Sequence, residues 1–437
     1  MVHSEIRDPK SKIPPRAVVI SFDRWHIGFI GCYGNDWIET PNLDRLATQA
    51  VVFDQHFAEN IDPTAANHAW WTGAVQFPLD EEQQRACPTW IDDLHARGIA
   101  TQLIVESDGR DDTTVAPPFG RIVTARGTDG FEVAEQDTPF ARTVREVERW
   151  LKSGACTTQP AVLWIKSRGV PAPWIPPRAF GELYLEEFGL ASQGESRREP
   201  DEPSADDAPE GEETPDREDT EEEPAPVGVD ESLDWRYGAA MYAAYVTLLD
   251  RWLGKLLQIL ETSPEWNGAL LIVTAGAGQA LGEHGRIADE RSPLRAESVH
   301  APLFLRVPGT DQEGTRRQAI VQTIDVAPTL LDWFSDPADS QYTEGQEPVG
   351  RGRSLLSLIR NEVAALRDVA WMGSGRLEWG LRTVDFFYAE PGDGNPDPEP
   401  PPAVLFEKPH DNWDQFDVAP QFRQVTEDMH GMLNWVR

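Results

Sequence analysis

The chain of 437 residues carries 39 Lys and Arg residues against 74 Asp and Glu residues, a formal net charge of −35. This charge disfavours nucleic acid and anionic membranes as partners. Hydrophobic residues make up 40% of the chain, as in globular proteins, and no run reaches the roughly 18 apolar residues that span a bilayer. The first residues lack the apolar stretch of a secretory signal, and Cys32, Cys87 and Cys156 are widely spaced. We therefore expect reduced thiols and a cytoplasmic protein.

Apolar runs alternate with amphipathic stretches along most of the chain. This alternation predicts an α/β protein with a parallel sheet and helices on both faces. The expected strands are 16–23, 99–107, 161–167, 269–276 and 301–309, with a hairpin-like pair of strands over 370–390. The expected helices are 64–73, 90–98, 138–154, 235–261, 322–334 and 419–437, and 40–53 is expected to hold a helix followed by a strand. Thr40, which precedes Pro41, is the expected N-cap of the first helix.

One acidic segment interrupts this pattern. Residues 195–223 contain fifteen acidic and three basic residues and almost no apolar ones, so they cannot bury enough surface to offset the entropy of ordering. We expect a disordered insert over 195–232. It would divide an α/β domain into parts 1–194 and 233–365, followed by a small C-terminal subdomain over 366–437.

The strand 269–276 ends in a turn of small residues, Gly276, Ala277 and Gly278. Ligands of open α/β sheets bind at the carboxyl ends of the strands, so the turn is a candidate site by position. Gly276, Gly278 and Gly282 form a GxGxxxG pattern, which departs from the dinucleotide-binding fingerprint. A tight turn is the simpler interpretation.

The segment 21–60, "SFDRWHIGFIGCYGNDWIETPNLDRLATQAVVFDQHFAEN", resembles the opening of the sulfatase family within the alkaline-phosphatase-like superfamily. Further matching stretches follow in order, among them "WTG", "LGEHG", "ESVHAPLFLRVPG", "TIDVAPTLLD" and "GRSLLSLI". The resemblance covers nearly the whole chain apart from the acidic segment. It implies an α/β/α sandwich with a mainly parallel central sheet, and a small C-terminal antiparallel sheet with a helix packed on it.

The resemblance also implies a divalent cation, bound by Asp23 and by an Asp followed by Asn or His at the end of the strand 269–276. Gly276 and Ala277 stand at those positions and offer no side-chain ligand, and Arg24 stands where a further ligand often lies. Hard cations bind about six oxygens, so Asp23 alone would not hold one. We expect no cofactor, with Ca²⁺ or Mg²⁺ only if the site is active, and we expect Arg24 to pair with Asp23.

The nucleophile implied by the resemblance is a formylglycine made from Cys or Ser, ten residues before Gly73. Pro63 stands there, and Thr64 follows it in "TAANH". That run resembles the Thr-x-x-Asn-His of related phosphodiesterases, although Thr64 is one position too close to Gly73. Thr64 is therefore a candidate catalytic residue, and a helix N-cap is the alternative.

The candidates for anion or substrate binding are Asn67, Lys166, Arg291 and His300. Asn67 replaces the arginine of the family's nucleophile segment, and Arg291 loosely matches a family lysine. Lys166 brings positive charge to the segment 165–177, where the family usually has a His-rich stretch. Three further histidines, His26, His68 and His284, are expected to be structural.

Three functions follow from these residues. The first is a sulfatase-family protein without classical sulfuric ester hydrolysis, which binds a small anionic ester or a protein partner. The second is an active sulfuric or phosphoric ester hydrolase that uses Thr64 in a rearranged site. The third is an interaction scaffold that works through the acidic insert.

Overall fold

The computed structural model describes residues 14–75, 89–107, 119–154, 158–187, 235–287, 293–335, 351–375, 377–397 and 399–436. The predicted insert over 195–232 lies outside these residues, as do Arg291, Cys87 and Cys156. Within the described part of the chain, no helix is long and apolar enough to cross a membrane.

A sheet of eight strands forms the centre of the molecule, in the order β5-β4-β6-β1-β7-β8-β2-β9. Its first five strands in that order run parallel, and β8 is antiparallel to both β7 and β2. The strands are β1 (Arg16–Arg24), β2 (Val51–Phe53), β4 (Ala100–Ser107), β5 (Arg121–Arg126), β6 (Ala161–Gly169), β7 (Leu270–Ala277), β8 (Leu303–Arg306) and β9 (Arg316–Arg317). The predicted fold class is confirmed, and β5 is a strand that the sequence patterns missed.

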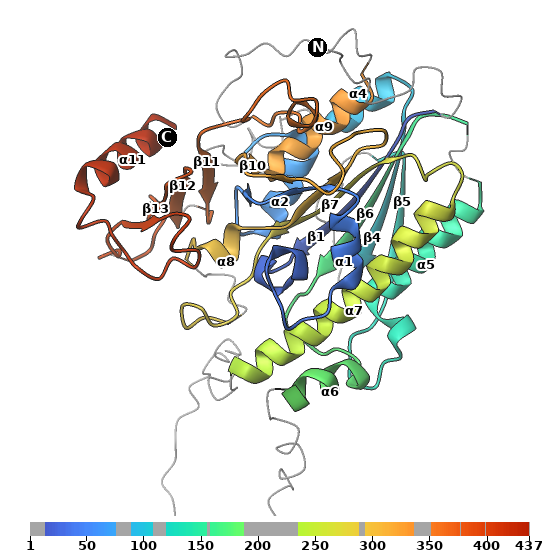
Figure 1. Cartoon of the computed structure of the whole chain (residues 1–437), viewed down its shortest axis with the longest axis horizontal. Coiled ribbons are helices and arrows are strands. Elements are labelled where there is room, and N and C mark those ends of the chain that lie inside the picture. The colour runs from blue at the N-terminus through green and yellow to red at the C-terminus, as the bar shows by residue number, and fades with distance from the viewer. Residues whose placement is uncertain are drawn as a thin grey trace, which may run out of the picture.

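Helices cover both faces of this sheet (Figure 1). Successive side chains of β1 point to opposite faces of the sheet: Val18 and Ile20 pack in one apolar cluster, and Val19 packs in the other. The first face is covered by α1 (Pro41–Ala47), α5 (Pro139–Lys152) and α7 (Trp235–Thr262), with α6 (Arg178–Glu187) beside α7. The second is covered by α2 (Pro63–Thr72), α4 (Trp90–Ala96), α9 (Val326–Trp333) and α10 (Leu356–Ile359).

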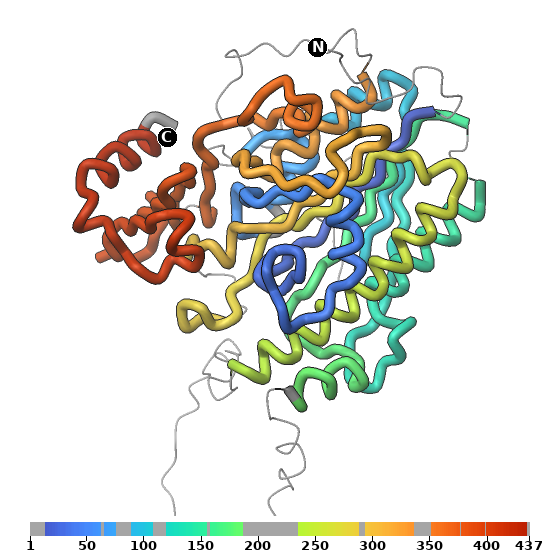
Figure 2. Tube along the Cα trace, in the orientation of Figure 1, coloured from blue at the N-terminus to red at the C-terminus, as the bar shows by residue number. Residues whose placement is uncertain are grey.

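The C-terminal subdomain is a four-stranded antiparallel sheet with one helix (Figures 1 and 2). It contains β11 (Ala370–Gly373), β12 (Glu378–Arg382), β13 (Phe386–Pro391), β14 (Val404–Glu407) and α11 (Arg423–Val436). Met429 and Leu433 of α11 pack on Leu381 and Tyr388. The prediction of only two strands over 370–390 is wrong, because the positive φ of Gly375 permits an extra turn between β11 and β12.

Short elements connect these layers. They are β3 (His56–Phe57), β10 (Val321–Gln322), α8 (Ala296–Val299), η1 (Ile27–Phe29), η2 (Gly31–Tyr33), η3 (Glu135–Asp137) and η4 (Thr323–Asp325). Asp325 in η4 is fully buried and forms an ion pair with Arg367. Asp325 also accepts hydrogen bonds from the backbone N–H groups of Gln322 and Arg353, each at 2.8 Å. Asp325 therefore joins three segments of the chain.

The N-terminus of α1 is capped by a residue of α7. Asp250 accepts hydrogen bonds from the backbone N–H of Leu43 at 2.8 Å and of Asn42 at 3.1 Å. Thr40 occupies the N-cap position before Pro41, as predicted, but its side chain makes no capping hydrogen bond to the helix. Its Oγ1 instead accepts a hydrogen bond from the Gly31 N–H at 2.8 Å, which holds the preceding turn.

Candidate functional site

Asp23 lies near the carboxyl end of β1, between β6 and β7. Its carboxylate contacts the Lys166 ammonium from β6, with Nζ 2.8 Å from Oδ1 and 3.0 Å from Oδ2. The side chains of Lys166 and Asp23 are 11% and 16% exposed, so water screens this ion pair only partly. The sequence patterns did not predict this contact, and the expected pairing of Arg24 with Asp23 stays a prediction.

Gly276 on β7 is the neighbour of Asp23 across the sheet. A Cβ atom at Gly276 would lie 2.6 Å from the Cβ of Ala66 and 3.1 Å from Cη2 of Trp70. Both residues belong to α2, which packs directly on this strand end. Ala277 is fully buried and carries only a methyl group. No carboxylate can therefore extend from position 276 without displacing α2.

The helix α2 carries the candidate nucleophile in its first turn. Thr64 is the second residue of the helix, which begins at Pro63, so it does not occupy the N-cap position. Further along α2, Asn67 has a buried Oδ1 and His68 a buried Nε2 that form no hydrogen bond within the described chain. Burial lowers the pKa of His68, so this imidazole is neutral at neutral pH.

A second carboxyl group lies at the carboxyl ends of β4 and β6. Glu106 on β4 accepts a hydrogen bond from Oγ of Ser167 at 2.7 Å, and burial raises the pKa of Glu106 to about 7. Nearby, the Tyr245 hydroxyl donates a hydrogen bond to Asp129 at 2.5 Å. Glu106 was not among the predicted site residues; its signal in the sequence is a lone acid at the end of the apolar run "QLIVES".

The histidines make structural contacts. His26 contacts Glu283 at 2.8 Å through Nε2, and His284 contacts Glu297 at 2.7 Å through Nδ1. These pairs join "LGEHG" to two other segments of the chain. Nε2 of His300 lies 2.8 Å from the carbonyl oxygen of Asp54. Burial lowers the pKa of His300 to about 3, which keeps its ring neutral.

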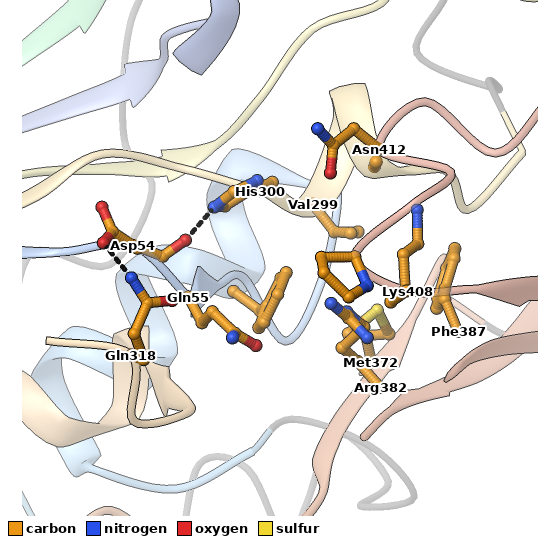
Figure 3. A pocket seen from close by; sticks show the side chains of 13 residues that line it. Asp54, Gln55, Val299, His300, Gln318, Met372, Arg382, Phe387, Lys408 and Asn412 are labelled. Carbon is orange, nitrogen blue, oxygen red and sulfur yellow. Dashed lines mark hydrogen bonds between the residues drawn. The ribbon is translucent and has the colours of Figure 1, made fainter. Parts of the chain in front are cut away.

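A cavity of about 190 Å³ lies between the main domain and the C-terminal subdomain (Figure 3). We call it the subdomain pocket. It contains one sequence-predicted site residue, His300, and none of Asp23, Asn67 and Lys166. Its lining residues are Asp54, Gln55, Phe57, Ala296, Val299, His300, Gln318, Met372, Arg382, Phe387, Lys408, Pro409 and Asn412.

Comparisons with known proteins agree with this architecture. The Sulfatase family model matches residues 194–336. N-acetylglucosamine-6-O-sulfatase of Bacteroides thetaiotaomicron is 28% identical over 208 residues, which cover 44% of this chain and 32% of that protein. Human iduronate 2-sulfatase is 24% identical over 378 residues, which cover 76% of this chain and 64% of that protein. The crystal structure of a phosphonate monoester hydrolase of Agrobacterium radiobacter superposes with a TM-score of 0.69 at 19% identity, covering 97% of this chain and 95% of that one.

These matches, with a family model that covers residues 194–336, support membership of the chain in the sulfatase family within the alkaline-phosphatase-like group of folds. Its alignments with the two sulfatases above span less than two thirds of the length of either protein.

Proposed function

We propose that this protein is a sulfatase-family member that works as a binding or regulatory protein and does not hydrolyse sulfate esters by the family's metal-dependent route. The observation that carries the proposal is the ion pair between Lys166 and Asp23. An ammonium group in contact with both carboxylate oxygens supplies the positive charge that a cation would supply there. The family typically uses a divalent cation, and that cation would have to displace the ammonium.

The packing of α2 supports the same conclusion. Ala66 and Trp70 fill the space that a side chain at position 276 would need. A hard cation requires several oxygen ligands, and within the described parts of the chain no group of three or more His, Cys, Asp and Glu residues is arranged to hold a metal ion. The residues at this strand end therefore do not fit a Ca²⁺ or Mg²⁺ site.

The alternative is an ester hydrolase that uses the Thr64 hydroxyl as nucleophile. Turnover of 4-nitrophenyl sulfate and bis(4-nitrophenyl) phosphate, measured with and without Ca²⁺ and Mg²⁺, separates the two functions. We expect equal background rates for the wild type and for Thr64→Ala. Turnover that exceeds the background and disappears in Thr64→Ala would overturn the proposal.

A scaffold role through 195–232 is a further proposal. A partner captured by the full chain and lost on deletion of this segment would support it.

A further inference from the structure

We propose that the subdomain pocket binds a small organic anion, whose carboxylate or sulfate group is held by the guanidinium of Arg382. The pocket shares no residue with the pair Asp23 and Lys166, so this inference is independent of the proposed function. It concerns the boundary between the two parts of the fold, where β12, β13 and the segment after β14 face the loop after β2 (Figure 3).

Arg382 is a buried cation that forms no ion pair with a described acid, although the carboxylates of Asp414 and Asp385 act on it from a longer distance. The residue is 6% exposed, and its Nη1 donates hydrogen bonds to the carbonyl oxygens of Thr383, Val384 and Phe386. Its guanidinium carbon lies 5.5 Å from the centre of the Phe57 ring. In the described part of the chain, no acid forms an ion pair with Arg382, and its Nε and Nη2 edge has no hydrogen-bond partner. Burial lowers the pKa of Arg382 to about 10, so the group remains charged at neutral pH.

The Nε and Nη2 edge of Arg382 matches one class of ligand group. The Nε–H and Nη2–H groups of an arginine point in parallel and match two oxygens of one carboxylate or sulfate. A mostly buried charge that lacks an ion-pair partner is unfavourable, and an anion bound at this edge would supply one.

The other charges around the pocket are already compensated. Lys408 forms an ion pair with Asp414 and donates a hydrogen bond to the carbonyl of Asp411. Asp54 is bound by Arg316 and accepts a hydrogen bond from Gln318. His300 is neutral because of its lowered pKa. The charge of Arg382 therefore determines the sign of the ligand.

The size and walls of the pocket define the rest of the ligand. A cavity of about 150 Å³ is known to hold benzene, so a cavity of about 190 Å³ accommodates one ring with one anionic group. Val299, Met372 and Phe387 supply apolar walls, and Gln55 and Asn412 supply polar groups. Oε1 of Gln55 is buried and accepts no hydrogen bond, so it can accept one from a hydroxyl of the ligand.

Calorimetric titration of the full chain with benzoate, phenyl sulfate and the neutral analogue benzyl alcohol tests the proposal. We expect one molecule of benzoate or phenyl sulfate to bind per chain, at least tenfold more tightly than benzyl alcohol. The Arg382→Gln variant should weaken anion binding about 10- to 100-fold, the usual range for a charge-assisted hydrogen bond. The matched control is Arg423→Gln, an exposed position on α11 of the same subdomain, which should leave the affinity unchanged.

A second variant covers the case in which Arg382→Gln fails to fold. Gln55→Glu keeps Arg382 and introduces a nearly isosteric carboxylate into the same pocket, whose negative charge repels an anionic ligand, so it should weaken anion binding by at least tenfold. The proposal is overturned if the anions bind wild-type protein no better than benzyl alcohol does, or if Gln55→Glu leaves their affinity unchanged. Chromatographic analysis of phenyl sulfate after the titration reports hydrolysis separately, so failure of the proposed function is distinguishable from failure of the pocket.

Discussion

The Lys166 ammonium contacts both carboxylate oxygens of Asp23, at 2.8 and 3.0 Å, across neighbouring parallel strands. This pair lies where the family resemblance places a divalent cation. An ammonium contributes one charge and no coordination geometry, so it can neutralise Asp23 without organising an ester for attack.

Removal of the lysine should destabilise the fold. Lys166→Met leaves the mostly buried Asp23 carboxylate without a counter-charge, at a cost of about 2–4 kcal/mol in the free energy of unfolding. The double variant Asp23→Asn with Lys166→Met should recover most of this loss, because no charge is then left unpaired. Urea denaturation of the wild type, the two single variants Asp23→Asn and Lys166→Met, and the double variant measures the coupling energy between Asp23 and Lys166. A coupling energy near zero would contradict the role of the pair.

The packing at Gly276 predicts that even a methyl group is not tolerated there. Gly276→Ala brings its Cβ to 2.6 Å from Ala66, and this overpacking should cost about 1–3 kcal/mol. The matched control is Gly268→Ala, because a Cβ at Gly268 meets no atom within 4 Å; its stability should stay within about 0.5 kcal/mol of wild type. Equal thermal midpoints for the two variants would show that the space at position 276 is open.

The carboxylate of Asp250 on α7 should stabilise the N-terminus of α1. Asp250→Ala removes the acceptor for the backbone N–H groups of Asn42 and Leu43, with an expected loss of about 2–4 kcal/mol. The exposed Gln258→Ala on the same helix serves as the control and should be near neutral. Hydrogen exchange of the amides of Asn42 and Leu43 should accelerate in the first variant only. Unchanged exchange there would argue against this cap.

Glu59 should make stability depend on pH. It is fully buried, neither carboxylate oxygen forms a hydrogen bond, and burial raises its pKa from 4.5 to about 8. Because the folded-state pKa is the higher one, the unfolded chain loses its proton first. Stability is therefore lost as the pH rises from about 4.5, and the loss levels off above about 8.

Glu59→Gln removes this titration. Relative to wild type, the variant should gain about 3 kcal/mol between pH 5 and pH 8, as measured by urea denaturation at both values. The exposed Glu407→Gln on β14 should show no such gain. A stability difference between Glu59→Gln and wild type that is the same at both pH values would show that Glu59 ionises normally.

The sequence predicted the central sheet and most of its helices because the apolar runs and glycine stops are local signals. It also identified the family and singled out Gly276 and Ala277. It could not predict the partner of Asp23, because Lys166 is 143 residues away and reaches it only through the order of the strands. Arg24 was the expected partner because it follows Asp23 directly in the sequence.

Other features depend on tertiary packing in the same way. The sequence shows that position 276 lacks a ligand, but not that Ala66 and Trp70 fill the space. The buried carboxyls of Glu59 and Glu106 look like ordinary acids at strand ends, and only the packing around them raises their pKa values. The subdomain pocket joins residues from both parts of the chain, and Arg382 was not among the sequence-predicted sites.

Calorimetric titration of the wild-type protein with Ca²⁺ and with Mg²⁺ shows whether a divalent cation can displace Lys166 from Asp23. Because Lys166 holds Asp23 and α2 fills the space at Gly276, we expect no binding of either ion at millimolar concentrations. One ion bound per chain at micromolar affinity, with the binding lost in Asp23→Asn, would contradict this expectation.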